Sequence, residues 1–259
     1  MVTALVTGGT SGIGAAFARA LAQRGDDLVL VARDAARLEE VANELRALGR
    51  QVEVLPADLA NRADVDRVAT RIEDAERPID LLVNNAGFSV HTKLTSRSIE
   101  DHDRAFEVMV RAVLVLGGAA GRAMRARGRG AIVNVSSTAG FITMGAYSSI
   151  KAWVTSYTEG LANELHGTGV TATALCPGWV HTEFHERAGI PKSSIPNFLW
   201  LDAEPLVATC LRDVERGRVI SLPSVRYKVL IWLLRHLPKA AVRAISRKIS
   251  SGRRDSLKE

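Results

Sequence analysis

Two kinds of apolar pattern alternate along the chain. Short runs of β-branched and apolar residues predict strands, and longer stretches with an apolar residue every three or four positions predict amphipathic helices. The predicted strands are Ala4–Thr7, Asp27–Val31, Val52–Leu55, Leu81–Val83, Ala131–Ser136, Thr171–Leu175 and Val219–Ser221. The predicted helices are Gly14–Arg24, Ala35–Leu48, Arg62–Ala75, Ile99–Arg127, Tyr147–His166 and Ala203–Arg216.

This alternation predicts an α/β fold. Strands joined in turn by helices pair in parallel through right-handed crossovers, which gives a doubly wound sheet with helices on both faces. We expect one domain over residues 1–222 and a basic, helical C-terminal extension over residues 223–259. Ligands of such a sheet bind beyond the carboxyl ends of its strands, so the loops after the strands hold the candidate site.

A glycine-rich turn follows the first predicted strand. Residues 7–14 read Thr-Gly-Gly-Thr-Ser-Gly-Ile-Gly and lead directly into the first predicted helix. Glycines allow a tight turn and let backbone N–H groups approach a pyrophosphate, which the helix N-terminus stabilises. A tight connection alone also favours glycine, but this position after the first strand favours a nucleotide site.

The end of the second predicted strand bears on the choice of nucleotide. An acidic residue there binds the 2′-hydroxyl of NAD, whereas an arginine accommodates the 2′-phosphate of NADP. The strand continues into Ala32, Arg33 and Asp34. Arg33 therefore favours NADP(H) over NAD(H), with a solvated Arg33 as the alternative. Asp34 is expected to cap the following helix.

Three further loops or helix starts carry polar groups. Asp58-Leu59 follows the third strand, and Asn84-Asn85-Ala86-Gly87 follows the fourth. These suit a closely bound ring and ribose, although Asn and Gly serve ordinary turns equally well. Tyr147 and Lys151 lie four residues apart, so they share one helix face. A lysine cation there would lower the phenol pKa from ~10 and suit it to proton transfer, although a surface Tyr/Lys pair is also common.

Five motifs occur in one order along the chain: Thr7–Gly14, Asn84–Gly87, Ser136-Ser137, Tyr147-xxx-Lys151 and Cys176–Thr182. In this order they resemble the single-domain short-chain dehydrogenase/reductase family over about residues 2–222. The resemblance implies a Rossmann fold, a nicotinamide cofactor and a Ser-Tyr-Lys catalytic group. Residues 1–222 would then form an NADP(H)-binding and catalytic domain.

The resemblance also implies a role for each matched residue. Ser137 would hydrogen-bond the substrate oxygen, Tyr147 would be the acid/base, and Lys151 would hold the nicotinamide ribose and tune Tyr147. The cofactor-binding residues expected from the motifs are Gly8, Thr10, Ser11, Gly12, Ile13, Gly14, Arg33, Asp58, Leu59, Asn85, Ala86, Gly87, Tyr147, Lys151, Pro177, Gly178, Val180 and Thr182.

Two positions depart from the family pattern. Many members carry an asparagine on the long helix before the fifth strand, and here Met109 stands in that place. This substitution puts a water-mediated proton relay from the lysine in doubt, but not hydride transfer. Ser137 and Tyr147 are ten residues apart, which is shorter than is common, and leaves Ser136 as an alternative. Ser137 is preferred because Thr-Ala-Gly follows it, as the family pattern has it.

Apolar residues near these motifs indicate the substrate class. Phe141, Met144, Trp179 and Phe184 are expected to line the substrate pocket, with the segment Phe198–Trp200, although each could instead belong to the core. The prediction is NADP(H)-dependent interconversion of a ketone or aldehyde and an alcohol on a lipophilic, steroid-, fatty-acyl- or polyketide-like molecule. The alternatives are an NAD-preferring alcohol dehydrogenase and a catalytically weak nucleotide sensor.

Composition excludes several other classes. The chain has 259 residues, of which 47% are hydrophobic, enough for a sizeable core. Cys176 and Cys210 cannot form a disulfide framework, the start of the chain has no signal-peptide pattern, and its longest apolar run has six residues. A cytoplasmic protein is expected. His181 and His185 lack a third ligand nearby, so no metal site is predicted.

Charge is concentrated at the C-terminal end. Residues 224–259 hold ten Lys or Arg and two Asp or Glu, a net charge of +8, which leaves −2 for the rest of the chain. No basic domain for nucleic acid is therefore present. Residues 224–237 and a segment from Pro238 to about Ser250 are predicted helices with apolar and basic sides.

Two interpretations of this basic extension stay open at the level of sequence. An amphipathic element of this kind suits peripheral contact with an anionic membrane surface. Alternatively, Val229–Leu234 packs over the substrate cleft or against a sister subunit. Family resemblance further implies a homo-oligomer, a dimer or tetramer, paired through the two long helices Ile99–Arg127 and Tyr147–His166.

Overall fold

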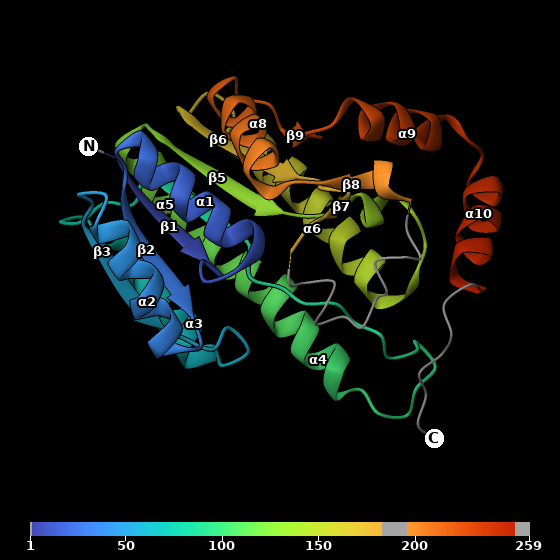
Figure 1. Cartoon of the computed structure of the whole chain (residues 1–259), viewed down its shortest axis with the longest axis horizontal. Helices are drawn as coiled ribbons and strands as arrows, with labels where there is room; N and C mark the ends of the chain where they lie inside the picture. The colour runs from blue at the N-terminus through green and yellow to red at the C-terminus, as the bar shows by residue number, and fades with distance from the viewer. Residues whose placement is uncertain (1, 183–195, 252–259) are drawn as a thin grey trace.

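A parallel sheet with helices on both faces forms the body of the protein (Figure 1). The structure is a computed structural model that describes residues 2–182 and 196–251. Its seven-stranded sheet has the order β3-β2-β1-β4-β5-β6-β9, and every neighbouring pair is parallel. The predicted doubly wound, Rossmann-type α/β fold is confirmed.

The elements follow one another as the apolar pattern predicts, with small shifts of their ends. The strands are β1 Thr3–Thr7, β2 Asp27–Ala32, β3 Val52–Pro56, β4 Leu81–Asn84, β5 Gly130–Val135, β6 Val170–Leu175 and β9 Ile220–Ser221, with a separate parallel pair β7 Trp179–Val180 and β8 Trp200–Leu201. The helices are α1 Gly12–Arg24, α2 Ala35–Arg46, α3 Arg62–Glu73, α4 Glu100–Phe106, α5 Ala112–Arg127, α6 Gly145–Glu164, α8 Ala203–Glu215, α9 Val225–His236 and α10 Lys239–Ser251.

One predicted helix is interrupted. The segment predicted as a single helix over residues 99–127 contains a π-helical turn, Glu107–Arg111, between α4 and α5. A single π-helical turn keeps the buried residues about three or four positions apart, as in an α-helix, so the apolar pattern does not distinguish the two. π-Helical turns occur often at functional sites, and this one carries Met109.

Alternate residues of the strands face two separate cores. Ala4 and Val6 of β1 pack with α1, α2 and α8, whereas Leu5 packs with α3, α5 and α6. Both faces of the central strands are therefore apolar, as a parallel sheet covered on both sides requires. These cores hold the strand ends in place, and the loops beyond those ends carry the candidate site.

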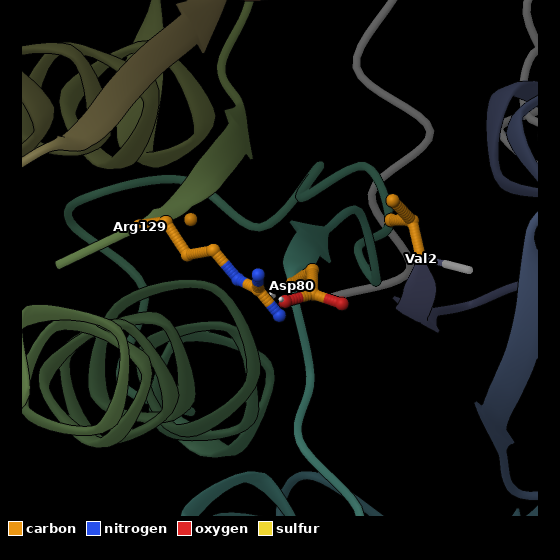
Figure 2. A pocket seen from close by; sticks show the side chains of 4 residues that line it. Val2, Asp80 and Arg129 are labelled. Atoms are coloured by element: carbon orange, nitrogen blue, oxygen red, sulfur yellow. Dashed lines mark ion pairs between the residues drawn. The ribbon is translucent and has the colours of Figure 1, made fainter. Parts of the chain in front are cut away.

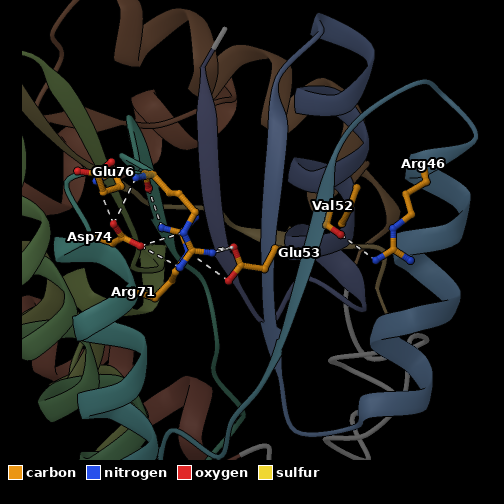
Figure 3. A network of polar contacts seen from close by, with 7 residues as sticks. Arg46, Val52, Glu53, Arg71, Asp74 and Glu76 are labelled. Atoms are coloured by element: carbon orange, nitrogen blue, oxygen red, sulfur yellow. Dashed lines mark hydrogen bonds and ion pairs between the residues drawn. The ribbon is translucent and has the colours of Figure 1, made fainter.

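Arginines from two helices secure the edge strand β3 (Figure 3). The Arg71 guanidinium of α3 is buried and donates to both carboxylate oxygens of Glu53, at 3.1 and 2.9 Å. Arg46 of α2 donates to the Val52 carbonyl at 2.8 Å. These hydrogen bonds join the edge strand β3 to α2 on one face of the sheet and to α3 on the other. The loop that carries Asp58 follows β3.

The C-terminal extension forms two helices, as predicted, drawn in red in Figure 1. Both lie on the side toward which the strands point. Tyr227 of α9 is buried, and Ser246 of α10 accepts a hydrogen bond from the Thr143 backbone N–H at 3.1 Å. Both helices therefore contact the loops beyond the carboxyl ends of the strands. None of the described helices is long and apolar enough to cross a membrane.

Candidate active site

The loops after β1 and β4 interlock at the point where the strand order reverses. The Asn85 amide donates to the carbonyls of Thr7 and Gly8 at 3.0 and 3.2 Å. The Thr7 hydroxyl accepts from the N–H groups of Asn85 and Ala86 at 2.9 and 3.1 Å. The two predicted motifs thus form one rigid unit beside a topological switch point, where doubly wound sheets bind their ligands.

The glycine-rich turn is packed too tightly for side chains. A Cβ on Gly14 would lie 2.1 Å from the Gly8 carbonyl oxygen, and Gly8 has a φ of +65° that only glycine adopts readily. Helix α1 begins at Gly12, and the preceding Ser11 makes no side-chain cap. The N–H groups of the first turn of a helix are well suited to bind an anion. This geometry fits the diphosphate of a nicotinamide dinucleotide.

Two arginines follow the end of β2. The Asp34 carboxylate accepts from the Arg37 backbone N–H at 3.0 Å, so Asp34 caps α2 as predicted. Arg33 is exposed, and the Arg37 side chain donates to the Thr10 carbonyl at 3.1 Å. The sequence interpretation missed Arg37, which lies in the first turn of α2, while Arg33 immediately precedes the N-cap residue Asp34.

Asp58 is held as a carboxylate at the end of β3. Burial raises its pKa, but hydrogen bonds from the Ala60 N–H and Arg104, with the charges of Arg104 and Arg33, bring that pKa below its usual value. The Arg104 guanidinium lies 3.1 and 3.0 Å from the two carboxylate oxygens. Arg104 comes from α4, far along the chain, and no local pattern predicted this pair.

Ser137, Tyr147 and Lys151 meet just beyond the end of β5. Strand β5 ends at Val135, and Ser137 precedes a 3₁₀ turn that leads to the first turn of α6. The Ser137 hydroxyl accepts from the Ala139 N–H at 3.1 Å and hydrogen-bonds with Tyr147. The Lys151 ammonium lies 5.6 Å from the centre of the Tyr147 ring. The three predicted catalytic residues therefore form one cluster.

The electrostatics of this cluster correct one expectation. The predicted lysine cation was to lower the pKa of Tyr147, but burial raises that pKa to about 12, against a smaller lowering by the Ser137 hydrogen bond. Lys151 donates instead to the Val135 carbonyl at 2.8 Å, and burial lowers the pKa of Lys151 to about 8. The lysine charge is directed at the backbone rather than at the phenol oxygen.

The neighbouring Ser136 has a different place. Its side chain is buried and donates to the Lys151 carbonyl at 2.7 Å, with Thr155 at the same distance. Ser136 thus joins the end of β5 to α6. Ser137 lies beside Tyr147, which supports its selection over Ser136.

Met109 lies behind the Asn-Asn-Ala-Gly turn. It is buried within the π-helical turn, and a Cβ on Gly87 would lie 3.1 Å from its sulfur. A thioether offers neither the donor nor the strong acceptor of an asparagine amide. Met109 fills this position with apolar volume.

The segment after β6 contacts both the loop after β5 and the glycine-rich turn after β1. The Thr138 N–H donates to the Pro177 carbonyl at 2.9 Å, and a Cβ on Gly12 would lie 3.3 Å from Thr182. Thr182 therefore lies beside the glycine-rich turn. The ring of Tyr227 lies over Gly178, because a Cβ on that glycine would come within 1.9 Å of it. Sequence patterns missed Tyr227, which belongs to the extension.

The predicted substrate-lining residues have different environments. Phe141, Met144 and Trp179 are half-buried, and the Arg235 guanidinium lies 5.4 Å from the centre of the Phe141 ring. Trp200 is buried and stacks on His181 at 4.7 Å, which makes it a core residue, whereas Phe198 is 62% exposed. Phe184 lies outside the described residues.

A cavity of about 260 Å³ lies away from this cluster (Figure 2). Val2, Asp80, Arg129 and Gly130 line it, and the last of these begins β5. Arg129 and Asp80 point toward one another across it, 3.6 Å apart. Ligands of doubly wound sheets bind at the opposite, carboxyl end. Among the described residues, no His, Cys, Asp or Glu cluster could hold a metal ion.

Comparison with known proteins agrees with this geometry. The model of the short chain dehydrogenase family matches residues 2–191, and the chain belongs to this family. It is therefore an oxidoreductase that acts on CH–OH and C=O groups with a nicotinamide cofactor.

Three relatives illustrate the range of the family. A protein of Streptomyces virginiae, named as a ketoacyl reductase of a monensin polyketide synthase, is 41% identical over 194 residues, 71% of this chain and 72% of its own. A short-chain dehydrogenase from Sphingobium yanoikuyae in complex with NADPH is 33% identical, with a TM-score of 0.83 over 100% of this chain and 99% of its own. A bulky-bulky ketone specific alcohol dehydrogenase from Comamonas testosteroni is 28% identical, with a TM-score of 0.78 over 100% and 97%.

Proposed function

We propose that this enzyme reduces a lipophilic ketone with NADPH, or oxidises the corresponding alcohol with NADP⁺. The observation that carries the proposal is the hydrogen-bonded Ser137–Tyr147 pair with Lys151 one helical turn away, at the end of β5. This cluster lies beyond the carboxyl end of β5, and the glycine-rich turn that fits a diphosphate lies beyond that of β1. When bound, the nicotinamide cofactor supplies or accepts a hydride at the substrate carbon.

The residues of the cluster divide the remaining chemistry among them. The Ser137 hydroxyl accepts from the Ala139 N–H, so its own proton is left to donate toward a substrate oxygen or Tyr147. Tyr147 has a pKa of about 12, which keeps its phenol protonated near neutral pH and able to deliver a proton to that oxygen. Lys151 is anchored by the Val135 carbonyl and supplies positive charge below its pKa of about 8.

The preference for NADP(H) rests on positive charge at the end of β2. Arg33 is exposed there and near enough to influence the Asp58 carboxylate, and Arg37 is joined to the Thr10 carbonyl. Arginine is well suited to a phosphate because its planar group donates two parallel hydrogen bonds. The related short-chain dehydrogenase in complex with NADPH supports the same preference.

A lipophilic substrate is supported by the apolar residues around the cluster. Phe141 and Met144 lie between Ser137 and Tyr147 in the chain, and both are half-buried, as is Trp179. Relatives named as acting on a bulky ketone and a ketoacyl group agree with this class. Across a homologous series of ketones, kcat/KM should rise roughly fourfold per added methylene while the chain fits, from about 0.8 kcal/mol per buried CH₂.

The test is the oxidation of NADPH followed by absorbance, with this ketone series, for the wild type and Tyr147→Phe. The variant removes the proton donor with little change of volume, so kcat should fall by about 10²- to 10⁴-fold while NADPH binding persists. Tyr157→Phe is the matched control, because Tyr157 lies on the same helix and its hydroxyl contacts the Leu114 carbonyl instead. Near-normal turnover of Tyr147→Phe would refute the role assigned to Tyr147.

A further inference from the structure

Helix α9 has apolar residues on two opposite sides. Tyr227 and Ile231 face the body and are 4% and 2% exposed. On the other side, about half a helical turn away, lie four large apolar side chains that are 50–75% exposed. We call this the outer stripe, and it comprises Val225, Val229, Trp232 and Leu233. Large apolar side chains that are exposed together on one side of a helix are typical of an interaction site.

The surroundings of the outer stripe are positively charged. Between residues 224 and 251 the sequence has seven Lys or Arg and no Asp or Glu. Lys228 and Arg226 lie beside the outer stripe on α9, and Lys239, Arg243 and Arg247 are exposed on α10. Such a surface attracts an anionic partner that also accepts apolar side chains.

We propose that α9 and α10 dock on the surface of an anionic lipid bilayer. A bilayer satisfies both features, because apolar side chains enter the boundary of headgroups and acyl chains while Lys and Arg meet lipid phosphates. A second copy pairing through the same face would bring like charges together, and a nucleic acid would leave the outer stripe in water. The helices lie on the bilayer, since neither is long and apolar enough to cross it.

Contacts of the two helices would orient the docked protein. Arg235 of α9 lies over the ring of Phe141, and Ser246 of α10 hydrogen-bonds the Thr143 backbone. Both contacts fall on the loop between Ser137 and Tyr147. Docking therefore places the substrate side of the catalytic cluster next to the bilayer, the source of lipophilic molecules. This last step rests on the proposed function, whereas the docking itself does not.

The experiment is vesicle co-sedimentation of the full-length protein. Vesicles contain phosphatidylcholine alone or phosphatidylcholine with phosphatidylglycerol. Binding to the anionic vesicles should be at least about tenfold stronger than to neutral ones and should weaken as salt rises from about 0.05 to 0.5 M. Trp232 should show a blue-shifted emission on binding, because it moves from water into the interface.

Two sets of variants separate the apolar and charged contributions. Trp232→Ser with Leu233→Ser should reduce anionic-vesicle binding by about tenfold or more, whereas Leu48→Ser with Leu94→Ser, equally exposed elsewhere, should not. Lys239→Gln, Arg243→Gln and Arg247→Gln together should have a similar effect, since each cation near the surface adds about tenfold or less. Lys93→Gln, Arg97→Gln and Arg216→Gln are the charge-matched control.

Several outcomes would overturn the proposal. These are no binding to anionic vesicles at low salt, undiminished binding of the outer-stripe variant, and equal loss in the control variants. If the outer-stripe variant instead lowers the molar mass measured by light scattering, a second copy covers this face. Thermal unfolding and NADPH binding check that each variant is folded. Turnover of a water-soluble ketone should be unchanged in the outer-stripe variant, so failure of docking and failure of catalysis are read separately.

Discussion

The most unusual environment at the level of single residues is that of Lys151. Its ammonium is buried among the end of β5 and the first turns of α6, with the Val135 carbonyl as its hydrogen-bond acceptor. Burial disfavours the charged form and brings its pKa to about 8. The charge of Lys151 is therefore sensitive to pH in the range where enzymes work, whereas the phenol of Tyr147 stays protonated.

This difference predicts how reduction depends on pH. The required forms are the neutral phenol of Tyr147 and the charged Lys151, and both predominate below pH about 8. As pH rises through about 8, Lys151 loses its proton, so kcat/KM for reduction should fall by up to about tenfold per pH unit. A pH–rate profile measures it. The Lys151→Arg variant keeps its positive charge at high pH, so the activity that this variant retains should not fall above pH about 8. If the pH–rate profile of the variant still falls there, a group other than Lys151 causes the fall.

A second prediction at this scale concerns the choice of cofactor. Arg33→Ala should raise KM for NADPH about 10- to 100-fold, which corresponds to one charge-assisted hydrogen bond of about 1.5–3 kcal/mol, and should change KM for NADH little. Arg37→Ala should act in the same direction, because Arg37 also holds the Thr10 carbonyl. Arg19→Ala, on α1 and paired with Glu44, is the control. Equal losses with both cofactors would show that Arg33 does not contact the 2′-phosphate.

At the level of elements, α9 holds the segment after β6 in place through Tyr227. The Tyr227 hydroxyl accepts from the Trp179 N–H at 3.1 Å and donates to the Leu199 carbonyl at 2.7 Å. Its ring fills the space above Gly178, which no larger residue could share. The extension therefore supports the loop that carries Pro177, Gly178 and Val180, which the family motif predicts to bind the cofactor.

Removing the Tyr227 hydroxyl should lower both the stability of the fold and the affinity for the cofactor. Tyr227→Phe leaves two backbone groups without their partner at little change of volume, which should lower the free energy of unfolding by about 1–3 kcal/mol and raise KM for NADPH. Denaturant unfolding and initial rates measure the two effects. Tyr157→Phe should change little, since its hydroxyl makes one longer bond of 3.4 Å. A wild-type KM in Tyr227→Phe would show that the loop is held by other contacts.

For the whole molecule, two large apolar side chains remain exposed on α4 and α5. Phe106 and Leu114 are 51% and 49% exposed there, on the long helical segment through which relatives are expected to pair. If this segment joins two copies, Leu114→Arg should reduce the molar mass in light scattering toward that of one chain, because it buries an unpaired charge. Leu48→Arg, with the same 49% exposure just after the end of α2, should not. An unaltered mass in both variants would move the interface elsewhere.

Local patterns were sufficient for the arrangement of the body. Residues within one turn or one strand determine the order of strands and helices along the chain, the cap formed by Asp34 and the ends of most elements. These features can therefore be read from the pattern of apolar and polar residues. The glycine-rich turn and the Asn-Asn-Ala-Gly turn were also visible, because their conformations require particular residue types.

Tertiary structure decided what depends on residues far apart in the chain. Three contacts join segments that are distant in the chain: the Arg104–Asp58 ion pair, the hydrogen bond from Lys151 to the Val135 carbonyl, and the packing of the Tyr227 ring on Gly178. The two sides of α9 are both apolar, so the sequence alone determined a helix with apolar and basic residues but not which side faces the body. Packing decided that, because burial depends on which loops lie opposite once the sheet has brought the strand ends together.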